Sequence, residues 1–113
     1  MIEPLQNAGL FDRLMLALRR RSAFRVDGDS MLPTLAGGDI VIVKPGNTFS
    51  ENDIVLARHP FRHDVKILKR ICSISPDGSV HLVGDNPSES TDSRTFGAVS
   101  IESIIGRVTS RLK

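Results

Sequence analysis

One serine in this chain, Ser30, lies where its hydroxyl could do chemistry. It sits in the run VDGDSMLPTL at positions 26–35, in which glycine, two aspartates and proline favour a turn. A serine hydroxyl is a poor nucleophile at neutral pH unless a base lies beside it. Without a base, the same run is an ordinary turn whose hydroxyl bonds nearby backbone.

The candidate base is Lys69, in the run DVKILKRI at positions 64–71. An unperturbed lysine, with a pKa of about 10.4, is almost entirely protonated at pH 7, but burial among apolar side chains lowers that pKa. Because strand residues alternate between faces, Lys69 is expected between two isoleucines, whereas Lys66 and Arg70 share a face that suits solvent. The alternative is that Lys69 extends from an edge strand with only its stem buried.

A third segment, GDNPSESTDSR at 84–94, is too polar and too rich in turn residues to be core. Its Asp92 and Arg94 could form a local ion pair. A flexible lysine amine must be held in line with the nucleophile, and a neighbouring hydroxyl can hold it. The segment offers three such hydroxyls, those of Ser88, Ser90 and Ser93.

Length and composition fit one ordinary globular domain with a modest core. The chain has 113 residues, of which 40% are hydrophobic and 25% are charged. Its net charge of +2 is uneven, since residues 1–25 hold five arginines against two carboxylates and residues 26–113 hold ten Lys/Arg against eleven Asp/Glu. The body therefore lacks the basic face of a nucleic-acid-binding protein.

Cysteine usage and hydropathy favour a soluble cytoplasmic protein. The single cysteine, Cys72, cannot form an intrachain disulfide, and we expect it to pack in the core rather than act as a nucleophile. No apolar run reaches the roughly 18 residues of a transmembrane helix. The arginines at 19–21 follow the apolar stretch instead of preceding it, unlike those of a secretory signal.

The histidines do not indicate a metal site. His59 and His63 have the spacing of two ligands on a helix, but Pro60 lies between them and breaks such a helix. We therefore expect no metal and no cofactor.

Residues 9–21 are predicted to form an amphipathic helix. Six apolar residues share one face at 100° per residue, and a mostly charged face lies opposite. The apolar face comprises Leu10, Phe11, Leu14, Met15, Ala17 and Leu18. We expect this helix to dock on the domain; a membrane-surface anchor and a partner-binding helix are the alternatives.

After residue 23 the pattern changes to short β-branched runs separated by turn residues. These runs predict strands at 40–43, 54–58, 65–72, 80–83 and 104–109. The absence of a helical pattern between them predicts a mostly β body, a coiled, partly closed antiparallel sheet. We therefore expect a short N-terminal amphipathic arm over residues 1–23 and a β domain over 24–113.

Together these segments resemble the signal-peptidase-like serine proteases of the Ser/Lys dyad type. GDSMLPTL at 28–35 is similar to that family's nucleophile box, and Gly38-Asp39 with the following strand to its second box. Lys69-Arg70 is similar to the lysine box. The last box is matched by Gly84, Asp85, Asn86, Ser90, Asp92, Ser93, Arg94 and Gly97. The resemblance covers roughly residues 24–108 and implies a signal-peptidase- or repressor-protease-like fold.

By this resemblance Ser30 is the nucleophile and Lys69 the general base of a serine endopeptidase. Ser90 would orient the lysine, and Asp92 with Arg94 would brace the loop. The apolar residues after the nucleophile, Met31 and Leu32, are expected to shape small pockets for the residues preceding the cut.

The sequence also departs from the family pattern. The membrane segments that anchor ordinary signal peptidases are missing, and the Pro-Gly-Asp that usually follows the lysine box is absent. Gly28, two residues before the nucleophile, has no hydroxyl to donate to an oxyanion, so the Ser30 backbone N–H would lead that task.

Within the family, the chain most resembles the proteases that mature nickel-type superoxide dismutase. That resemblance implies a protein substrate, the nickel superoxide dismutase precursor, from which an N-terminal leader is removed. Two alternatives stay open: a related processing enzyme with another leader or signal peptide as substrate, and a non-catalytic β module that binds peptide segments.

Overall fold

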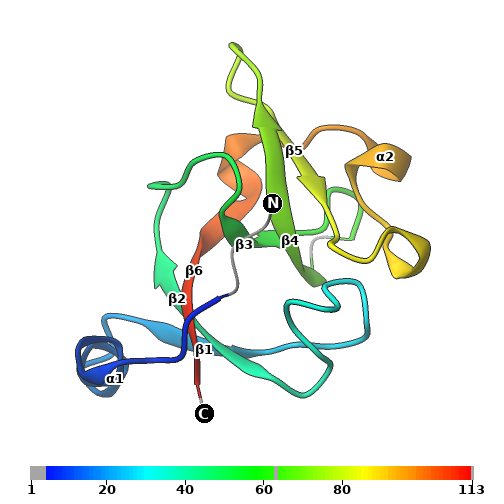
Figure 1. Ribbon diagram of the computed structural model, residues 1–113. Coiled ribbons are helices and arrows are strands. Elements are labelled where there is room, and N and C mark those ends of the chain that lie inside the picture. Colours follow the sequence, from blue (N-terminus) through cyan, green and yellow to red (C-terminus); the bar gives the residue numbers. More distant parts are fainter. Residues whose placement is uncertain (1–4, 63, 113) are drawn as a thin grey trace.

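The structure is a computed structural model that describes residues 5–62 and 64–112. Its body is a six-stranded antiparallel sheet with the strand order β1-β2-β6-β3-β4-β5, and the sheet is not closed (Figure 1). The strands are β1 (Ser22–Arg25), β2 (Ile40–Pro45), β3 (Ile54–Arg58), β4 (Lys66–Ile74), β5 (Val80–Val83) and β6 (Ile104–Leu112). The prediction of a mostly β, antiparallel fold with one short N-terminal helix is confirmed.

The helical elements are short and lie outside the sheet. They are α1 (Leu10–Ala17), α2 (Ser93–Phe96) and the two 3₁₀ turns η1 (Pro87–Glu89) and η2 (Ile101–Ser103). Among the described helices, none is long and apolar enough to cross a bilayer. The N-terminal residues 1–4 of the predicted arm and His63 lie outside the described residues, and the division at residue 23 stays a prediction.

Five of the strands were predicted from their β-branched runs, with small differences at the ends. β1 was missed because its sequence, SAFR, has neither a hydrophobic run nor alternation between apolar and polar residues. It forms through pairing with β2, in which Phe24 lies opposite Val41, and it is the strand at one edge of the sheet.

The neighbouring strands β3 and β4 lie inside the sheet and are buried on both faces, because the sheet and its loops form two hydrophobic cores. Leu56 and Leu68 belong to the first core, with residues of β2 and β6. Val55 and Ile71 belong to the second core, which β5 completes. The alternation rule assumes one solvent face, so the expectation that Arg70 faces solvent is wrong: its side chain is buried.

Cys72 also differs from expectation, since the structure places it in an exposed position rather than in the core. The pairing of β4 with β5 shifts register between Ile71 and Ser73. A bulge leaves one residue unpaired and re-aims its side chain, and here that residue is Cys72.

Helix α1 contacts the domain, as expected, but through the opposite face. Asp12 accepts a hydrogen bond of 2.7 Å from the buried Ser110 Oγ and lies 3.9 Å from the Arg21 guanidinium. Ser110 is fully buried, and a buried hydroxyl needs a partner, which Asp12 supplies. Docking by this polar face turns the apolar face outward, where Leu10, Phe11, Leu14 and Leu18 are exposed.

Candidate active site

The turn that carries Ser30 is anchored from both sides. Met31 and Leu35 are buried in the first core, and the Leu35 N–H donates to the Met31 carbonyl. On the other side, the Asn86 N–H donates to the Ser30 carbonyl at 2.8 Å, and the Asn86 side chain donates to the Asp29 carbonyl at 3.0 Å. These contacts fix the main chain on both sides of the half-buried Ser30 side chain.

Gly84 permits this close approach because it has no side chain. A Cβ at this position would lie 2.7 Å from the Ser30 carbonyl oxygen and would collide with the Ser90 hydroxyl. Contacts below 3 Å to a backbone carbonyl cannot be relieved by moving a flexible side chain. Gly84 therefore lets the Ser30 turn and the Ser90 loop share one small space.

Lys69 lies on β4, opposite Val55 of β3, and is only 5% exposed. Its Nζ donates a hydrogen bond of 2.9 Å to the Ser90 Oγ. Burial lowers the pKa of Lys69 below its ordinary value of 10.5; the Asp92 carboxylate opposes this and the Arg94 guanidinium reinforces it. Of the two expectations for Lys69, burial of the amine is the one that the structure shows; the side chain does not extend into solvent.

Asp92 organises the loop around Ser90. It is fully buried and accepts hydrogen bonds from the Gly84 N–H at 2.8 Å, the Ser90 Oγ at 2.8 Å and the Arg94 side chain. Burial alone would raise the pKa of Asp92, but these bonds outweigh it and hold the pKa well below its ordinary value. Asp92 is therefore a carboxylate that can only accept hydrogen bonds.

The charge of Asp92 fixes the direction of the neighbouring hydrogen bonds. The Ser90 hydroxyl donates its hydrogen bond to Asp92, so the Ser90 oxygen can accept the hydrogen bond from Lys69. Asp92 also caps α2, where it accepts from the Arg94 N–H at 3.0 Å. Of the three serines considered in this segment, only Ser90 bonds Lys69 within the described chain: Ser88 donates to the Asn86 side chain and Ser93 accepts from the Leu82 N–H.

Ser30 and Lys69 lie on the same pocket, which has a volume of about 160 Å³. Its other lining residues are Phe24, Val26 and Asp27 from the β1 side, Met31 from the turn, and Lys66, Ile67 and Leu68 from β4. Among the hydrogen bonds of the described residues, none joins the Ser30 Oγ to the Lys69 Nζ. Met31 lines this pocket, whereas Leu32 is half-buried beside it in sequence and is not among the lining residues.

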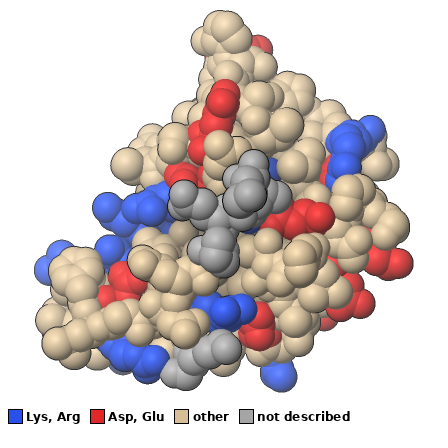
Figure 2. Space-filling model, in the orientation of Figure 1, with Lys and Arg blue, Asp and Glu red and all other residues tan. Residues whose placement is uncertain are grey.

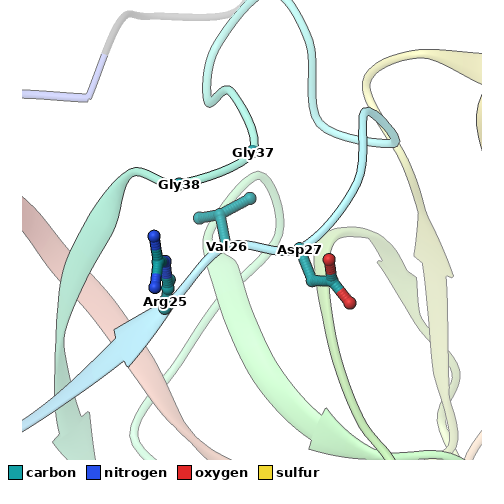
Figure 3. Close-up of a pocket in the computed structure, with 5 residues that line it drawn as sticks. All are labelled: Arg25, Val26, Asp27, Gly37 and Gly38. Carbon is teal, nitrogen blue, oxygen red and sulfur yellow. The ribbon is translucent and has the colours of Figure 1, made fainter.

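A second, larger pocket of about 480 Å³ adjoins the first. Figure 3 shows its lining residues, with the Val26 side chain directed toward the segment at Gly37. Val26 and Asp27 line both pockets, so the two hollows meet along the chain that follows β1.

An ion pair that sequence analysis missed joins three of the motifs. Arg70 donates to the Asp85 carboxylate through Nε at 2.9 Å and Nη2 at 2.8 Å, and Thr34 donates to the same carboxylate at 2.6 Å. Arg70 also donates to the Asn52 carbonyl at 2.6 Å. Thr34, Arg70 and Asp85 all belong to the motifs quoted above. Their pairing follows only from the burial of both faces of β4, which the sequence pattern does not show.

The match to known families decides the classification. The model of the family described as Peptidase S24-like matches residues 10–109, which include Ser30, Lys69 and the whole loop at 84–94. The chain belongs to this family.

Curated relatives of this S24-like chain are mitochondrial proteins. It is 32% identical over 108 residues to mitochondrial inner membrane protease subunit 1 of Xenopus tropicalis, a match covering 75% of this chain and 65% of the relative. The human protein of the same name is 31% identical over 104 residues, covering 72% and 63%. Mitochondrial ATP-independent inner membrane protease subunit 1a of Arabidopsis thaliana is 32% identical over 117 residues, covering 80% and 70%. The chain spans less than two thirds of the length of the frog and human relatives.

The Asp85–Arg70 ion pair makes the free energy of unfolding of this chain vary with pH in the acidic range. Burial raises the pKa of Asp85, but the bonds from Arg70 and Thr34 lower it further, so the net pKa lies below the ordinary 3.8. The unfolded chain therefore binds more protons than the folded chain near that pH, and the free energy of unfolding falls as the pH drops below about 4.

We expect Asp85→Asn to lower the free energy of unfolding at pH 7 by about 3–5 kcal/mol, because it leaves a buried guanidinium without its counter-charge. It should also flatten the loss of stability below pH 4. Urea denaturation between pH 3 and 7 measures both effects. Glu51→Gln, at an exposed position, is the matched control; equal stability of the two variants would contradict the role of the pair.

Proposed function

We propose that this chain is a serine endopeptidase in which Ser30 is the nucleophile and Lys69 the general base. The observation that carries the proposal is the burial of Lys69 on the pocket that Ser30 also lines. Lysine can act as a base only when neutral, and desolvation brings its pKa toward the working pH. Family membership supports the same assignment.

The hydrogen bonds around Lys69 leave its lone pair available for this role. A neutral amine has two N–H donors and one lone pair. One N–H of Lys69 donates a hydrogen bond to the Ser90 Oγ, and the Ser90 hydroxyl in turn donates a hydrogen bond to Asp92. Lys69 is thus held by a bond that it donates, and its lone pair can accept the Ser30 proton.

Catalysis then follows the acyl-enzyme route. The Ser30 Oγ attacks the scissile carbonyl carbon while its proton passes to the Lys69 Nζ. The resulting ammonium gives that proton to the leaving amine as the C–N bond breaks. Neutral Lys69 next takes a proton from a water that attacks the ester, and the Ser30 Oγ leaves with that proton as the ester bond breaks.

The negative charge on the carbonyl oxygen needs a donor, and the Ser30 backbone N–H supplies one. Within the described chain this N–H makes no hydrogen bond, whereas the neighbouring Asn86 and Leu35 N–H groups are engaged. A preorganised backbone donor of this kind stabilises the oxyanion that forms in the transition state.

Reaction requires the Ser30 Oγ to come within hydrogen-bond distance of the Lys69 Nζ. The Ser30 side chain can pass between staggered rotamers while its main chain stays anchored. Catalytic hydrogen bonds often tighten only when substrate is bound, so we propose that an occupied pocket selects the reactive rotamer.

The edge of the sheet offers a place for an extended substrate. β1 lies at the end of the strand order, and Phe24 and the adjacent Val26 line the pocket. A peptide added beside a strand edge gains backbone hydrogen bonds, with alternate side chains entering pockets. Met31, at the base of the same pocket, would contact the residues before the cut, and Leu32 is proposed to support it.

Removal of either member of the dyad tests the proposal. Ser30→Ala and Lys69→Met should each reduce kcat/KM for a cleaved precursor by about 10³-fold or more, because the nucleophile and its base act as a unit. Lys44→Met, on β2, is the matched control and should cleave like the wild type. Wild-type rates for either dyad variant, measured by mass spectrometry of the products, would refute the assignment.

The pH profile tests the charge balance around the lysine. Because the folded pKa of Lys69 is lowered, kcat/KM should rise with pH through a single ionisation below 10.5. Arg94→Gln removes a cation that opposes the ammonium, so the midpoint should move to higher pH, with activity lost near pH 7 and regained above. Arg58→Gln, at another exposed arginine, should leave the midpoint in place; an acidic optimum in the wild type would exclude lysine as the base.

We propose that the substrate is a precursor protein from which an N-terminal leader is removed, and that this precursor is the one of nickel superoxide dismutase. The resemblance described above supports this choice. A second candidate, the leader or signal peptide of another precursor, is supported by the names of the relatives, which are inner membrane proteases.

Purified chain incubated with each precursor separates the candidates. We expect the nickel superoxide dismutase precursor to lose its leader at one bond, detected by N-terminal mass spectrometry, with S30A as the inactive control. Cleavage of signal-peptide precursors but not of the dismutase would favour the second candidate. Binding of both without cleavage by the wild type would identify a peptide-binding module instead.

A further inference from the structure

Helix α1 presents an apolar face that the other described residues leave exposed. Leu10 is 85% exposed, Phe11 63%, Leu14 49% and Leu18 57%. At 100° per residue these four side chains fall within one arc of about 100°. A continuous exposed apolar stripe of this kind marks an interaction surface rather than scattered surface residues.

The polar side of the same helix is already occupied by the protein itself. Asp12 is the only carboxylate in residues 5–25, and it is directed at Ser110 of the domain and at Arg21, which follows the helix. The helix therefore cannot turn its apolar face inward without breaking the bond to the buried Ser110. Its outward face is held in place by the fold.

Positive charge flanks the exposed face. Arg19 and Arg20 follow the last turn and are both exposed. Figure 2 shows Lys and Arg side chains on either side of the surface at the lower left of the molecule, where Figure 1 places α1. An apolar stripe bordered by arginines, with its one acid turned away, matches the acyl and anionic headgroup layers of a bilayer surface.

We propose that α1 docks this protein on the surface of an anionic phospholipid bilayer. Leu10, Phe11, Leu14 and Leu18 enter the headgroup–acyl boundary, and Arg19 and Arg20 contact lipid phosphates. A second copy of the chain is a poorer occupant, because its α1 brings no free carboxylate to Arg19 and Arg20: Asp12 is already engaged. The proposal does not depend on the peptidase function.

Helix α1 is close along the chain to the pocket that holds Ser30 and Lys69, so docking by α1 would also place this pocket near the membrane. β1 is the next element after α1, separated from it by residues 18–21, and its Phe24 lines the pocket that holds Ser30 and Lys69. A four-residue strand spans about 13 Å. Docking by α1 would thus keep the pocket within a short distance of the lipid headgroups.

Sedimentation of the full chain with lipid vesicles tests the proposal. Wild-type protein should bind vesicles of phosphatidylglycerol and phosphatidylcholine, bind pure phosphatidylcholine vesicles weakly, and lose binding as salt is raised. F11S/L14S should weaken binding at least about tenfold by removing apolar contact. R19Q/R20Q should weaken binding to the anionic vesicles by about thirtyfold.

Matched controls separate the helix from general surface effects. Phe61→Ser replaces an aromatic that is 75% exposed on the β3–β4 connection, and R58Q/R62Q removes two other exposed arginines; all should bind like the wild type. Unchanged melting temperatures would show that the α1 variants are folded. Failure of the wild type to bind anionic vesicles, or binding by F11S/L14S equal to wild type, would overturn the proposal. So would self-association of the wild type, seen by sedimentation velocity, that F11S/L14S abolishes without any vesicle binding.

Discussion

The geometry of the site depends on a carboxylate that stays charged inside the protein. Asp92 is fully buried, and its bonds to the Gly84 N–H, the Ser90 hydroxyl and the Arg94 guanidinium outweigh the cost of burying its charge. Because Asp92 accepts the hydrogen bond of the Ser90 hydroxyl, Lys69 must be the donor in the Ser90–Lys69 hydrogen bond. Its charge also favours the protonated lysine, and the Arg94 charge offsets that effect.

The sheet makes this arrangement possible by burying both faces of β3 and β4. Lys69 and Arg70 are adjacent on β4 and are both buried, yet they meet different partners. Lys69 donates a single hydrogen bond to the uncharged Ser90 hydroxyl, whereas Arg70 is paired with the Asp85 carboxylate. One lysine is thus left without a direct ion pair, so its desolvation is not cancelled.

Much of the fold and of the site could be predicted from the sequence, because turn residues and β-branched runs act locally. They predicted five of the six strands, and the family resemblance carried by four ordered motifs pointed to Ser30, Lys69 and Ser90, which the structure places around one pocket and one loop. Burial of both sheet faces is a tertiary property, so the pairing of Arg70 and the exposure of Cys72 were not predicted. The face on which α1 docks was also missed, since its bond to the buried Ser110 is a tertiary contact that hydrophobic periodicity does not report.

The segment from Gly84 to Asp92 touches both halves of the site. Asn86 holds the main chain of Ser30, and Ser90 holds the amine of Lys69. A displacement of this loop would therefore act on both groups. A compound that displaced the loop from the sheet would disturb the proposed nucleophile and the proposed base together, which makes the loop a target for inhibitors that bind outside the pocket.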